Sequence, residues 1–481
     1  MIIIGLDLGT TGIRAIAFRS DASIAAKVYQ EIPIHCPQAG WVEQDPMQIW
    51  DITVSVLREL ASKVPVSEWQ GLGISNQRET TILWDAKTGL PLYPAISWQC
   101  RRTASRCDEL ADDSDMIKSI TGLRLDAYFS ATKIEWILEN VPETTACLAR
   151  GDLRFGTVDS WVLWKANQGK VHATDLSNAS RTMLLNIQNG SYDETCLDLF
   201  GVPRDIVPEL RDSAGDFGAF DASILGKELP IYAVLGDQQA ALFGQGIWEP
   251  GALKATYGTG LFCMGYTGPE RLGNDALLDT IAWKRDGQIH YAWEGSAFIA
   301  GAAIQWCRDQ MGWIQDAAES SELAASAAES EGLLFNPGFC GLWAPFWVPE
   351  ATAGFTGIRR DTSRSQLIRA VLESVAFQCK AIVDVADLDE NIVMKVDGGM
   401  TRNQWLMQFQ ATLLGRELQV PDCQESTCLG AAAMAGMYCG LSNDVMITGL
   451  KNESVDPVGI GGRSHAEAKY ERWLAYLLNK E

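Results

Sequence analysis

Apolar runs separated by glycine-rich turns are the clearest pattern in this sequence. Residues 2–8 form one apolar run and residues 13–18 form another, with the turn Gly-Thr-Thr-Gly between them. Two short apolar runs joined by such a turn predict a β-hairpin. A second copy of the pattern, GALKATYGTGLFCMGYTG, covers residues 251–268. Because the copies lie about half a chain apart, we interpret them as the beginnings of two related halves.

Helical periodicity follows both hairpins. Apolar residues recur every three or four positions in residues 131–141, 236–246, 363–388 and 465–478, as in amphipathic helices. Residues 317–332 are small and acidic, and we expect an exposed helix or a connector there. Mixed strands and helices indicate an α/β fold. Because no long linker or low-complexity tail is evident, we expect two lobes that share a cleft.

Length and charge narrow the class of protein. With 481 residues, 47% of them apolar, the chain can fill more than one core, so we expect two or three domains. Its 39 basic and 61 acidic residues give a net charge of -22, which disfavours a nucleic-acid partner. A small anion such as a nucleotide remains compatible with this charge if backbone N–H groups and a metal ion offset it locally.

Cysteine and histidine usage favours a reduced, cytoplasmic protein. The twelve cysteines include no Cys-x-x-Cys pair, and the N-terminus has no basic region or cleavage site of a signal peptide. The four histidines lie far apart in sequence, which gives little support to a zinc site. Since no apolar run approaches the ~20 residues needed to span a bilayer, we expect no membrane insertion.

The first glycine turn carries candidate phosphate-binding chemistry. Gly9 and Gly12 let successive N–H groups face one point, Thr10 and Thr11 add hydroxyl donors, and Asp7 lies at the end of the preceding strand. That carboxylate suits a magnesium ion held through water. An ordinary hairpin turn explains the same residues equally well. The second turn, residues 256–260, favours a clamp on polyphosphate, and neither turn is a Walker loop or a GxGxxG fingerprint.

Two further sites are ambiguous on their own. Asp397, Gly398 and Gly399 precede a helix expected to start near Asn403, which permits close approach of a purine but is typical of a plain strand-to-helix turn. Asp237 follows an apolar strand and opens a helix. A helix N-cap is the favoured interpretation, while acceptance of a proton from an attacking hydroxyl is the functional alternative.

The ordered blocks of the chain resemble a known family. DLGTTGIRA, GISNQRETT, AISWQCRRT, GTVDSWVLWK, DLSNASRTMLLNI, GDQQAALFGQ, YGTG and DGGMTRNQWLMQFQ are similar to motifs of the FGGY family of carbohydrate kinases, most of all its glycerol kinases. The resemblance implies two ribonuclease-H-like domains of the actin/sugar-kinase superfamily with a cleft between them. It implies a polyol site and first phosphate hairpin in residues 1–243, and a second hairpin and adenosine site in residues 244–481.

The resemblance also implies the residues that bind the acceptor. Arg78 and Glu79 match the pair that holds substrate hydroxyls, which need both a donor and an acceptor. The other implied acceptor contacts are Trp98 and Phe262 as an apolar wall, Tyr128 as a hydrogen-bonding group, and Gln238. Asp237 matches the general base. Packing in a core is the alternative for Trp98 taken alone.

The resemblance implies the residues of the nucleotide site in the same way. Asp7 matches the carboxylate near Mg²⁺. The positions around the ATP phosphates are Thr10, Thr11, Arg14 and Thr259, and those around the nucleoside are Gly301, Gln305, Gly399 and Asn403. The implied reaction is in-line transfer of the γ-phosphoryl group to a terminal hydroxyl, with Asp237 taking the proton and lobe closure excluding water.

Three departures from the family pattern bear on specificity. Leu8 replaces a glutamine, Cys100 replaces an aspartate, and residues before GDQQ lack the Gly-Lys-Gly-Gly-Thr-Arg loop that binds fructose 1,6-bisphosphate in some bacterial members. Glycerol is the favoured acceptor, with erythritol, xylulose or ribulose as the alternative. A non-catalytic actin-like nucleotide-binding protein and an unrelated two-domain binding protein are weaker alternatives, and a homodimer remains open.

Overall fold

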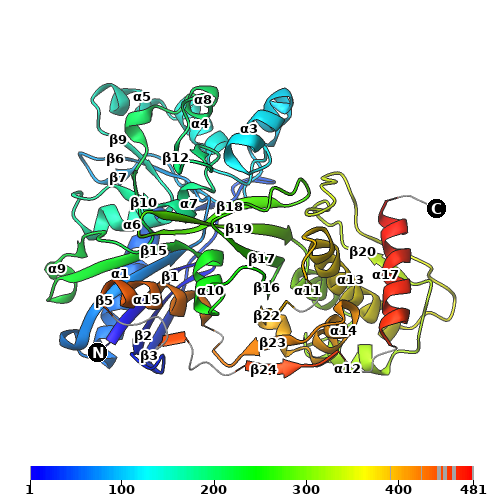
Figure 1. Cartoon of the computed structure of the whole chain (residues 1–481). Helices are drawn as coiled ribbons and strands as arrows, with labels where there is room; N and C mark the ends of the chain where they lie inside the picture. Colours follow the sequence, from blue (N-terminus) through cyan, green and yellow to red (C-terminus); the bar gives the residue numbers. More distant parts are fainter. Residues whose placement is uncertain are drawn as a thin grey trace.

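The computed structural model describes residues 2–389, 392–423, 425–440, 446–447, 452–457 and 462–478. These residues form two lobes, each built on one mixed β-sheet with helices packed against it (Figure 1). The predicted α/β fold with two lobes is therefore confirmed.

The sheet of the first lobe has six strands in the order β14-β15-β5-β1-β2-β3. Strands β1 to β3 form an antiparallel meander, whereas β5 and β15 run parallel to β1. The carboxyl ends of β1, β5 and β15 therefore lie side by side, so the segments that follow them meet at one edge of the sheet. The strands are β1 (Ile2–Leu8), β2 (Gly12–Arg19), β3 (Ile24–Glu31), β5 (Trp69–Asn76), β14 (Ala219–Phe220) and β15 (Leu229–Gly236).

The sheet of the second lobe repeats this plan. Its order is β18-β19-β17-β16-β22-β23-β24. Here β16 and β17 form the antiparallel hairpin, and β22 and β23 follow in parallel, as β5 and β15 follow β1. The two related halves predicted from the hairpins are therefore confirmed. The strands are β16 (Leu253–Tyr257), β17 (Leu261–Gly268), β18 (Leu278–Arg285), β19 (Gln288–Ala297), β22 (Met394–Asp397), β23 (Leu418–Pro421) and β24 (Asn452–Val455).

The helices expected from periodicity are present. They are α4 (Ala131–Asn140), α10 (Asp237–Gly244), α13 (Arg364–Val385) and α17 (Arg463–Leu477). A capping box starts α13, because the Ser363 and Gln366 side chains each bond the other residue's backbone N–H. The acidic segment 317–332 forms the short helix α12 (Glu319–Ser326), but it is less exposed than expected, since Ser320 and Ala324 are buried.

Much of the first lobe above its sheet in Figure 1 is an insertion of helices and short strands between β5 and β14. Outside this insertion, α1 (Pro46–Lys63) packs on β2 and β3, and α11 (Gly301–Asp309), α14 (Gln404–Leu414) and α15 (Ser426–Tyr438) follow the hairpin of the second lobe. The elements of the insertion are β6 (Ile82–Asp85), β7 (Leu90–Pro91), β8 (Ala95–Ile96), α2 (Ala104–Glu109), α3 (Ser114–Thr121), α5 (Pro142–Ala149), β9 (Leu153–Gly156), α6 (Val158–Ala166), β10 (Ala173–Asp175), α7 (Leu176–Ala179), β11 (Leu185–Asn186), β12 (Ser191–Tyr192), α8 (Glu194–Leu199) and β13 (Glu209–Arg211).

Helix α15 returns from the second lobe to the sheet of the first (Figure 1). It approaches so closely that a Cβ atom on Gly5 of β1 would lie 2.1 Å from the Cys428 carbonyl oxygen, and one on Gly73 of β5 would lie 1.9 Å from that of Ala431. The contact with α10 is equally close, because a Cβ on Gly430 would lie 1.8 Å from the carbonyl oxygen of Ala240. Glycine at these positions allows the helix to rest directly on backbone.

A shared core lies around these two helices. One buried apolar cluster contains Ile3 and Leu235 from the first sheet, Met264 and Trp283 from the second, and residues of α10 and α15. Residues of both lobes therefore pack together without a gap. The predicted domain boundary between residues 243 and 244 falls inside the last turn of α10, and it stays a prediction. Among the described residues, no helix combines the length and apolar character needed to cross a membrane.

We expect Gly73→Ala to lower the melting temperature markedly, because the added methyl group would overlap a backbone oxygen of α15. Overpacking of this kind typically costs about 1–3 kcal/mol of unfolding free energy. Gly332→Ala is the matched control, since a Cβ there meets no atom within 4 Å. Differential scanning calorimetry tests the pair, and equal melting temperatures for the two variants would contradict the close packing of α15.

Candidate active site

The candidate catalytic residues meet where three parallel strands end. Asp7 is the penultimate residue of β1, Arg78 and Glu79 follow β5, and Asp237 directly follows β15. Since Leu8 is paired with Asn76, and Asn76 with Gly236, these segments leave the sheet at the same level. The structure therefore brings together residues that are far apart in the sequence.

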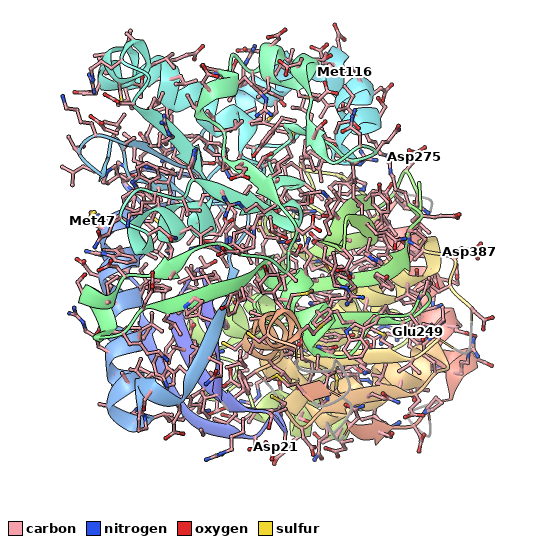
Figure 2. All side chains as sticks on the ribbon, turned by 60° about the vertical axis from the view of Figure 1, so that its left-hand side comes forward. Asp21, Met47, Met116, Glu249, Asp275 and Asp387 are labelled. Atoms are coloured by element: carbon pink, nitrogen blue, oxygen red, sulfur yellow. The ribbon has the colours of Figure 1, made fainter. Side chains whose placement is uncertain are left out.

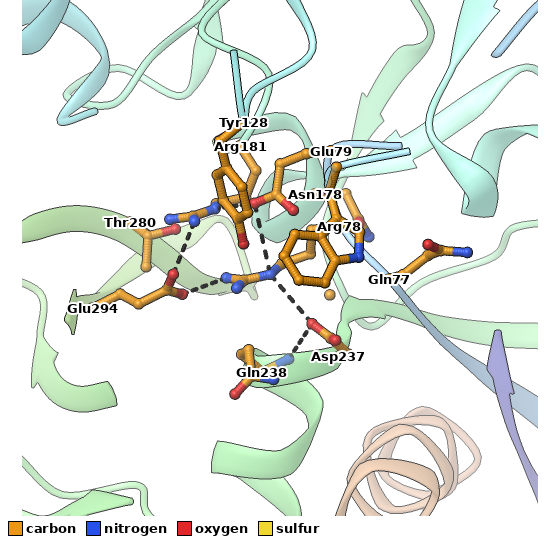
Figure 3. A network of polar contacts seen from close by, with 12 residues as sticks. Gln77, Arg78, Glu79, Tyr128, Asn178, Arg181, Asp237, Gln238, Thr280 and Glu294 are labelled. Atoms are coloured by element: carbon orange, nitrogen blue, oxygen red, sulfur yellow. Dashed lines mark hydrogen bonds and ion pairs between the residues drawn. The ribbon is translucent and has the colours of Figure 1, made fainter. Parts of the chain in front are cut away.

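Arg78 lies between three carboxylates (Figure 3). Its Nη1 donates to Glu294 Oε2 at 2.6 Å, its Nε lies 3.2 Å from Asp237 Oδ1, and the same Nε lies 3.9 Å from Glu79 Oε1. The Asp237 side chain keeps 32% of its surface exposed, whereas that of Arg78 keeps 2%. Asp237 is therefore the member of this group that remains accessible to a ligand.

Asp237 does not cap its helix. Gly236 is the N-cap of α10, and no side chain caps it, because Asp237 is already the first helical residue. Its Oδ1 accepts from the backbone N–H of Gln238 at 2.7 Å. The favoured interpretation from the sequence, an N-cap, is therefore wrong.

Two buried charges that the sequence did not single out hold this group in place. Arg181 donates from Nε to Glu79 Oε1 at 2.6 Å and from Nη2 to Glu294 Oε1 at 2.9 Å. Burial alone would raise the pKa of Glu294, but the guanidiniums of Arg181 and Arg78 outweigh it and lower that pKa to about 2. Burial raises the pKa of Glu79, against the opposing charges of the same two arginines.

The backbone at Glu79 has an uncommon conformation. Its φ is +63°, and the N–H of Thr80 donates to the Arg78 carbonyl at 2.7 Å, which closes a three-residue turn around Glu79. Positive φ in a residue with a side chain is uncommon and costs conformational energy. The surrounding ion pairs must therefore stabilise this turn.

Aromatic rings form one side of the site. The Trp98 ring lies 5.6 Å from that of Tyr128, and the Phe298 ring lies 6.1 Å from Trp98, 5.7 Å from Tyr128 and 6.5 Å from Phe262. Phe298, which was not predicted, therefore joins the three predicted rings. Trp98 Nε1 donates to Thr10 Oγ1 at 2.9 Å and so connects this wall to the first hairpin turn. Burial raises the pKa of Tyr128, which keeps its hydroxyl protonated.

Gln238 and Lys254 meet beside this group. Lys254 Nζ donates to Gln238 Oε1 at 2.6 Å and to Thr256 Oγ1 at 2.8 Å. The lysine is fully buried, and burial lowers its pKa, although the charges of Asp397 and Asp237 oppose this. The Gln238 side chain thus has an internal partner.

The first hairpin turn keeps its predicted phosphate donors accessible. Gly9 N–H donates to the Gly12 carbonyl at 3.1 Å, while Thr10 is half-buried and Thr11 is exposed. Arg14 Nη1 donates to Glu425 Oε2 at 2.8 Å, at the start of α15. Arg14 therefore already has a carboxylate partner from the second lobe.

Asp7 is the candidate for the metal ion. Its Oδ1 accepts from Ser75 Oγ at 2.7 Å, and burial raises its pKa to about 6, helped by the charge of Asp237. No cluster of three or more His, Cys, Asp or Glu side chains suited to a metal occurs among the described residues. Mg²⁺ fits such a site, because it is usually bound by one or two carboxylates together with water and substrate phosphates.

A pocket of about 480 Å³ in the second lobe contains the predicted nucleoside residues. These residues, Gly301, Gln305, Gly399 and Asn403, line it together with Thr259, which is predicted to lie near the phosphates. The backbone N–H groups at residues 300 and 302 donate to the Thr259 carbonyl at 2.9 and 3.0 Å, which fixes the second hairpin turn to the start of α11.

Asn403 has a structural task as well as a place in this pocket. It caps α14, where its Oδ1 accepts from Leu406 N–H at 2.9 Å and its Nδ2 donates to Ser320 Oγ at 3.0 Å. The predicted start of this helix near Asn403 is confirmed.

The departures from the family pattern lie within packed regions. Leu8 is 1% exposed and belongs to the core of the first lobe. Cys100 is fully buried, and its sulfur accepts from Arg102 Nε at 3.0 Å. The charge of Arg102 is balanced by Glu43, whose Oε1 lies 2.6 Å from Arg102 Nη2. Arg102 is therefore paired although position 100 carries a cysteine.

Comparisons with known proteins agree with this geometry. Residues 2–244 match the N-terminal domain of the FGGY family of carbohydrate kinases, and residues 253–439 match its C-terminal domain. The chain belongs to the FGGY family. It is accordingly a carbohydrate kinase.

The chain is 45% identical to glycerol kinase 2 of Thermotoga maritima, over 92% of this chain and 91% of the relative. It is 44% identical to glycerol kinase of Alkaliphilus oremlandii, over 98% and 95%. The solved structure of Plasmodium falciparum glycerol kinase with ADP matches with a TM-score of 0.91 at 30% identity, over 99% of this chain and 98% of that one. Xylulose kinase from Rhodospirillum rubrum has the same fold, with a TM-score of 0.87 at 24% identity, over 100% and 99%. The predicted sugar-kinase fold, with its ribonuclease-H-like domains, is confirmed.

We expect Asp7→Asn to raise the melting temperature at pH 7.5, measured without nucleotide and Mg²⁺. The pKa of Asp7 rises from 3.8 to about 6 on folding, so the ionised carboxylate destabilises the folded protein above pH 6, and this effect disappears below the unfolded value. The gain is therefore expected to shrink as the pH falls from about 7.5 to about 5.

Asp387→Asn is the matched control, because Asp387 lies exposed at the edge of the molecule (Figure 2) and its replacement is expected to change little. Thermal unfolding of both variants across the pH range tests this. A gain for Asp7→Asn that does not vary with pH would show that the carboxylate is not destabilised by its surroundings.

Proposed function

We propose that this protein transfers the γ-phosphoryl group of ATP to a terminal hydroxyl of glycerol and so produces glycerol 3-phosphate. The observation that carries the proposal is the placement of Arg78, Glu79 and the accessible Asp237 carboxylate together at the ends of β5 and β15. Relatives named glycerol kinase at 45% identity over most of the chain support it.

The acceptor site suits a short polyol. Adjacent hydroxyls need a hydrogen-bond donor and an acceptor, which Arg78 and Glu79 provide next to each other. Trp98 and Phe262 would contact the carbon skeleton, and the protonated Tyr128 hydroxyl and Gln238 would add hydrogen bonds. Gln238 would first have to exchange its bond with Lys254.

The nucleotide would extend from the pocket of the second lobe to the two hairpin turns. Gly301, Gln305, Gly399 and Asn403 would surround the nucleoside. Thr10, Thr11, Arg14 and Thr259 would lie around the phosphates. Asp7 would hold Mg²⁺, which supplies positive charge to the phosphate oxygens when it is bound.

Asp237 is the proposed general base. Its Oδ1 lies 3.2 Å from the Arg78 Nε, and its exposed surface allows an acceptor hydroxyl to approach. Transfer of that proton, together with positioning by Arg78 and Glu79, would prepare the hydroxyl oxygen for in-line attack.

Several finer assignments belong to the proposal. The domains of residues 1–243 and 244–481, the cytoplasmic location and a homodimer remain predictions. A larger polyol or a ketose (erythritol, xylulose or ribulose) is the second candidate for the acceptor. A non-catalytic actin-like protein is disfavoured, because Asp7, Arg78, Glu79 and Asp237 are all present.

An acceptor panel tests the proposed substrate. We expect ADP release to be fastest with glycerol among glycerol, dihydroxyacetone, erythritol, xylulose and ribulose, because one adjacent Arg-Glu pair matches a short chain of hydroxyls. The measurement is kcat/KM for each acceptor at saturating MgATP. A clear preference for a pentulose would overturn the choice of glycerol.

We expect Asp237→Asn to reduce turnover by about 10² or more, since the amide cannot accept the proton, while the fold and ADP binding persist. A coupled ADP-release assay and calorimetric titration with ADP measure the two effects. The control is Asp275→Asn, whose carboxylate lies on the surface (Figure 2) and pairs with Lys118. Near-normal turnover of Asp237→Asn would remove this residue from the mechanism.

A further inference from the structure

We propose that Arg181 and Glu294 are positioning residues for the acceptor, acting through Arg78 and Glu79. The inference rests on the proposed function, because it assigns to this pair the placement of the two side chains that would hold the acceptor hydroxyls. Neither residue was predicted from the sequence to belong to the site.

The four side chains form a closed ring of alternating charge (Figure 3). Arg78 contacts Glu294 at 2.6 Å, Glu294 contacts Arg181 at 2.9 Å, Arg181 contacts Glu79 at 2.6 Å, and Glu79 lies 3.9 Å from Arg78. Within the ring, each charge thus has two opposite charges as neighbours. A change in the position of one member is transmitted to both of its neighbours.

Burial makes this ring an unusual way to fill a core. No member exposes more than 2% of its side chain. Taking ions out of water is costly, and apolar side chains of similar volume often stabilise a fold as well or better. Within the described structure Arg181 Nη1 also has no hydrogen-bond partner, which adds to the cost. Stability alone therefore explains the ring poorly, whereas fixing a donor and an acceptor for a ligand explains it well.

Glu294 also determines how Arg78 divides its donors. Nη1 of Arg78 is engaged by Glu294, which leaves Nε directed at Asp237 and Glu79. The Glu294 carboxylate therefore fixes one end of the guanidinium, while Nε faces the two carboxylates of the first lobe.

The ring links the two lobes. Arg78, Glu79 and Arg181 belong to the first lobe, and Glu294 lies on β19 of the second. The chain continues from β19 to Phe298 in the aromatic wall and to Gly301 in the nucleoside pocket. Strand β19 and the segment that follows it therefore contact both the acceptor side chains and the nucleotide pocket.

The experiment measures wild type, Glu294→Gln and the double variant Arg181→Met/Glu294→Met. We expect both variants to raise the apparent KM for glycerol about tenfold or more, with ADP affinity changed by less than about threefold. The double variant removes one charge of each sign, so it is expected to melt closer to wild type than Glu294→Gln does. If the double variant regains the melting temperature of wild type but keeps the raised KM for glycerol, the two residues position the acceptor site and do more than support the fold.

A matched control is Asp279→Asn, which breaks the partly buried ion pair with Arg271, with a separation of 2.9 Å, in the same lobe. It is expected to lower the melting temperature without changing the KM for glycerol. The proposal is overturned if the variants of the ring also change only the melting temperature, or if the double variant fails to fold.

A wrong assignment of glycerol as the acceptor would give a different experimental result. In that case wild type itself would prefer another acceptor in the panel, and KM is then measured with that acceptor. A normal KM in folded variants, for whichever acceptor wild type prefers, overturns the role of Arg181 and Glu294 alone.

Discussion

The contact of α15 with the backbone of β1, β5 and α10 is the constraint on which the arrangement of the lobes depends. The helix belongs in sequence to the second lobe, yet it lies on the sheet of the first through Gly5 and Gly73, and on α10 through Gly430. Such contacts leave no room for sliding, because backbone atoms meet directly. They also place Glu425, at the start of α15, within reach of Arg14 in the first hairpin turn.

This packing brings charged side chains of both lobes together at the ends of the strands. Parallel strands β1, β5 and β15 deliver carboxylates and a guanidinium to one edge, and β19 of the other lobe approaches with Glu294. The ion pairs are strong here because protein replaces water around them. The same surroundings raise the pKa of Asp7 and lower that of Glu294, so neighbouring carboxyls differ widely in proton affinity.

Much of this structure could be predicted from local patterns, and the remainder depends on contacts that are distant in sequence. The two hairpins and the long helices could be predicted from glycine turns and apolar periodicity. Arg78 and Asp237 could be assigned to the site from family motifs. Arg181 and Glu294 have no local pattern, although Glu294 is a lone charge in a largely apolar stretch, which is a usable signal. Asp237 looked like a cap because the sequence cannot show that Gly236 already fills that position.

Several of the polar groups assigned to ligands are bonded within the protein itself. Trp98 donates to Thr10, and Lys254 donates to Gln238. Binding is therefore an exchange of partners, in which each new bond to a ligand replaces an internal one, and the net gain is smaller than the number of contacts suggests. For the same reason the internal bonds hold these side chains in defined orientations, so ligands would meet a site whose geometry the protein itself has fixed.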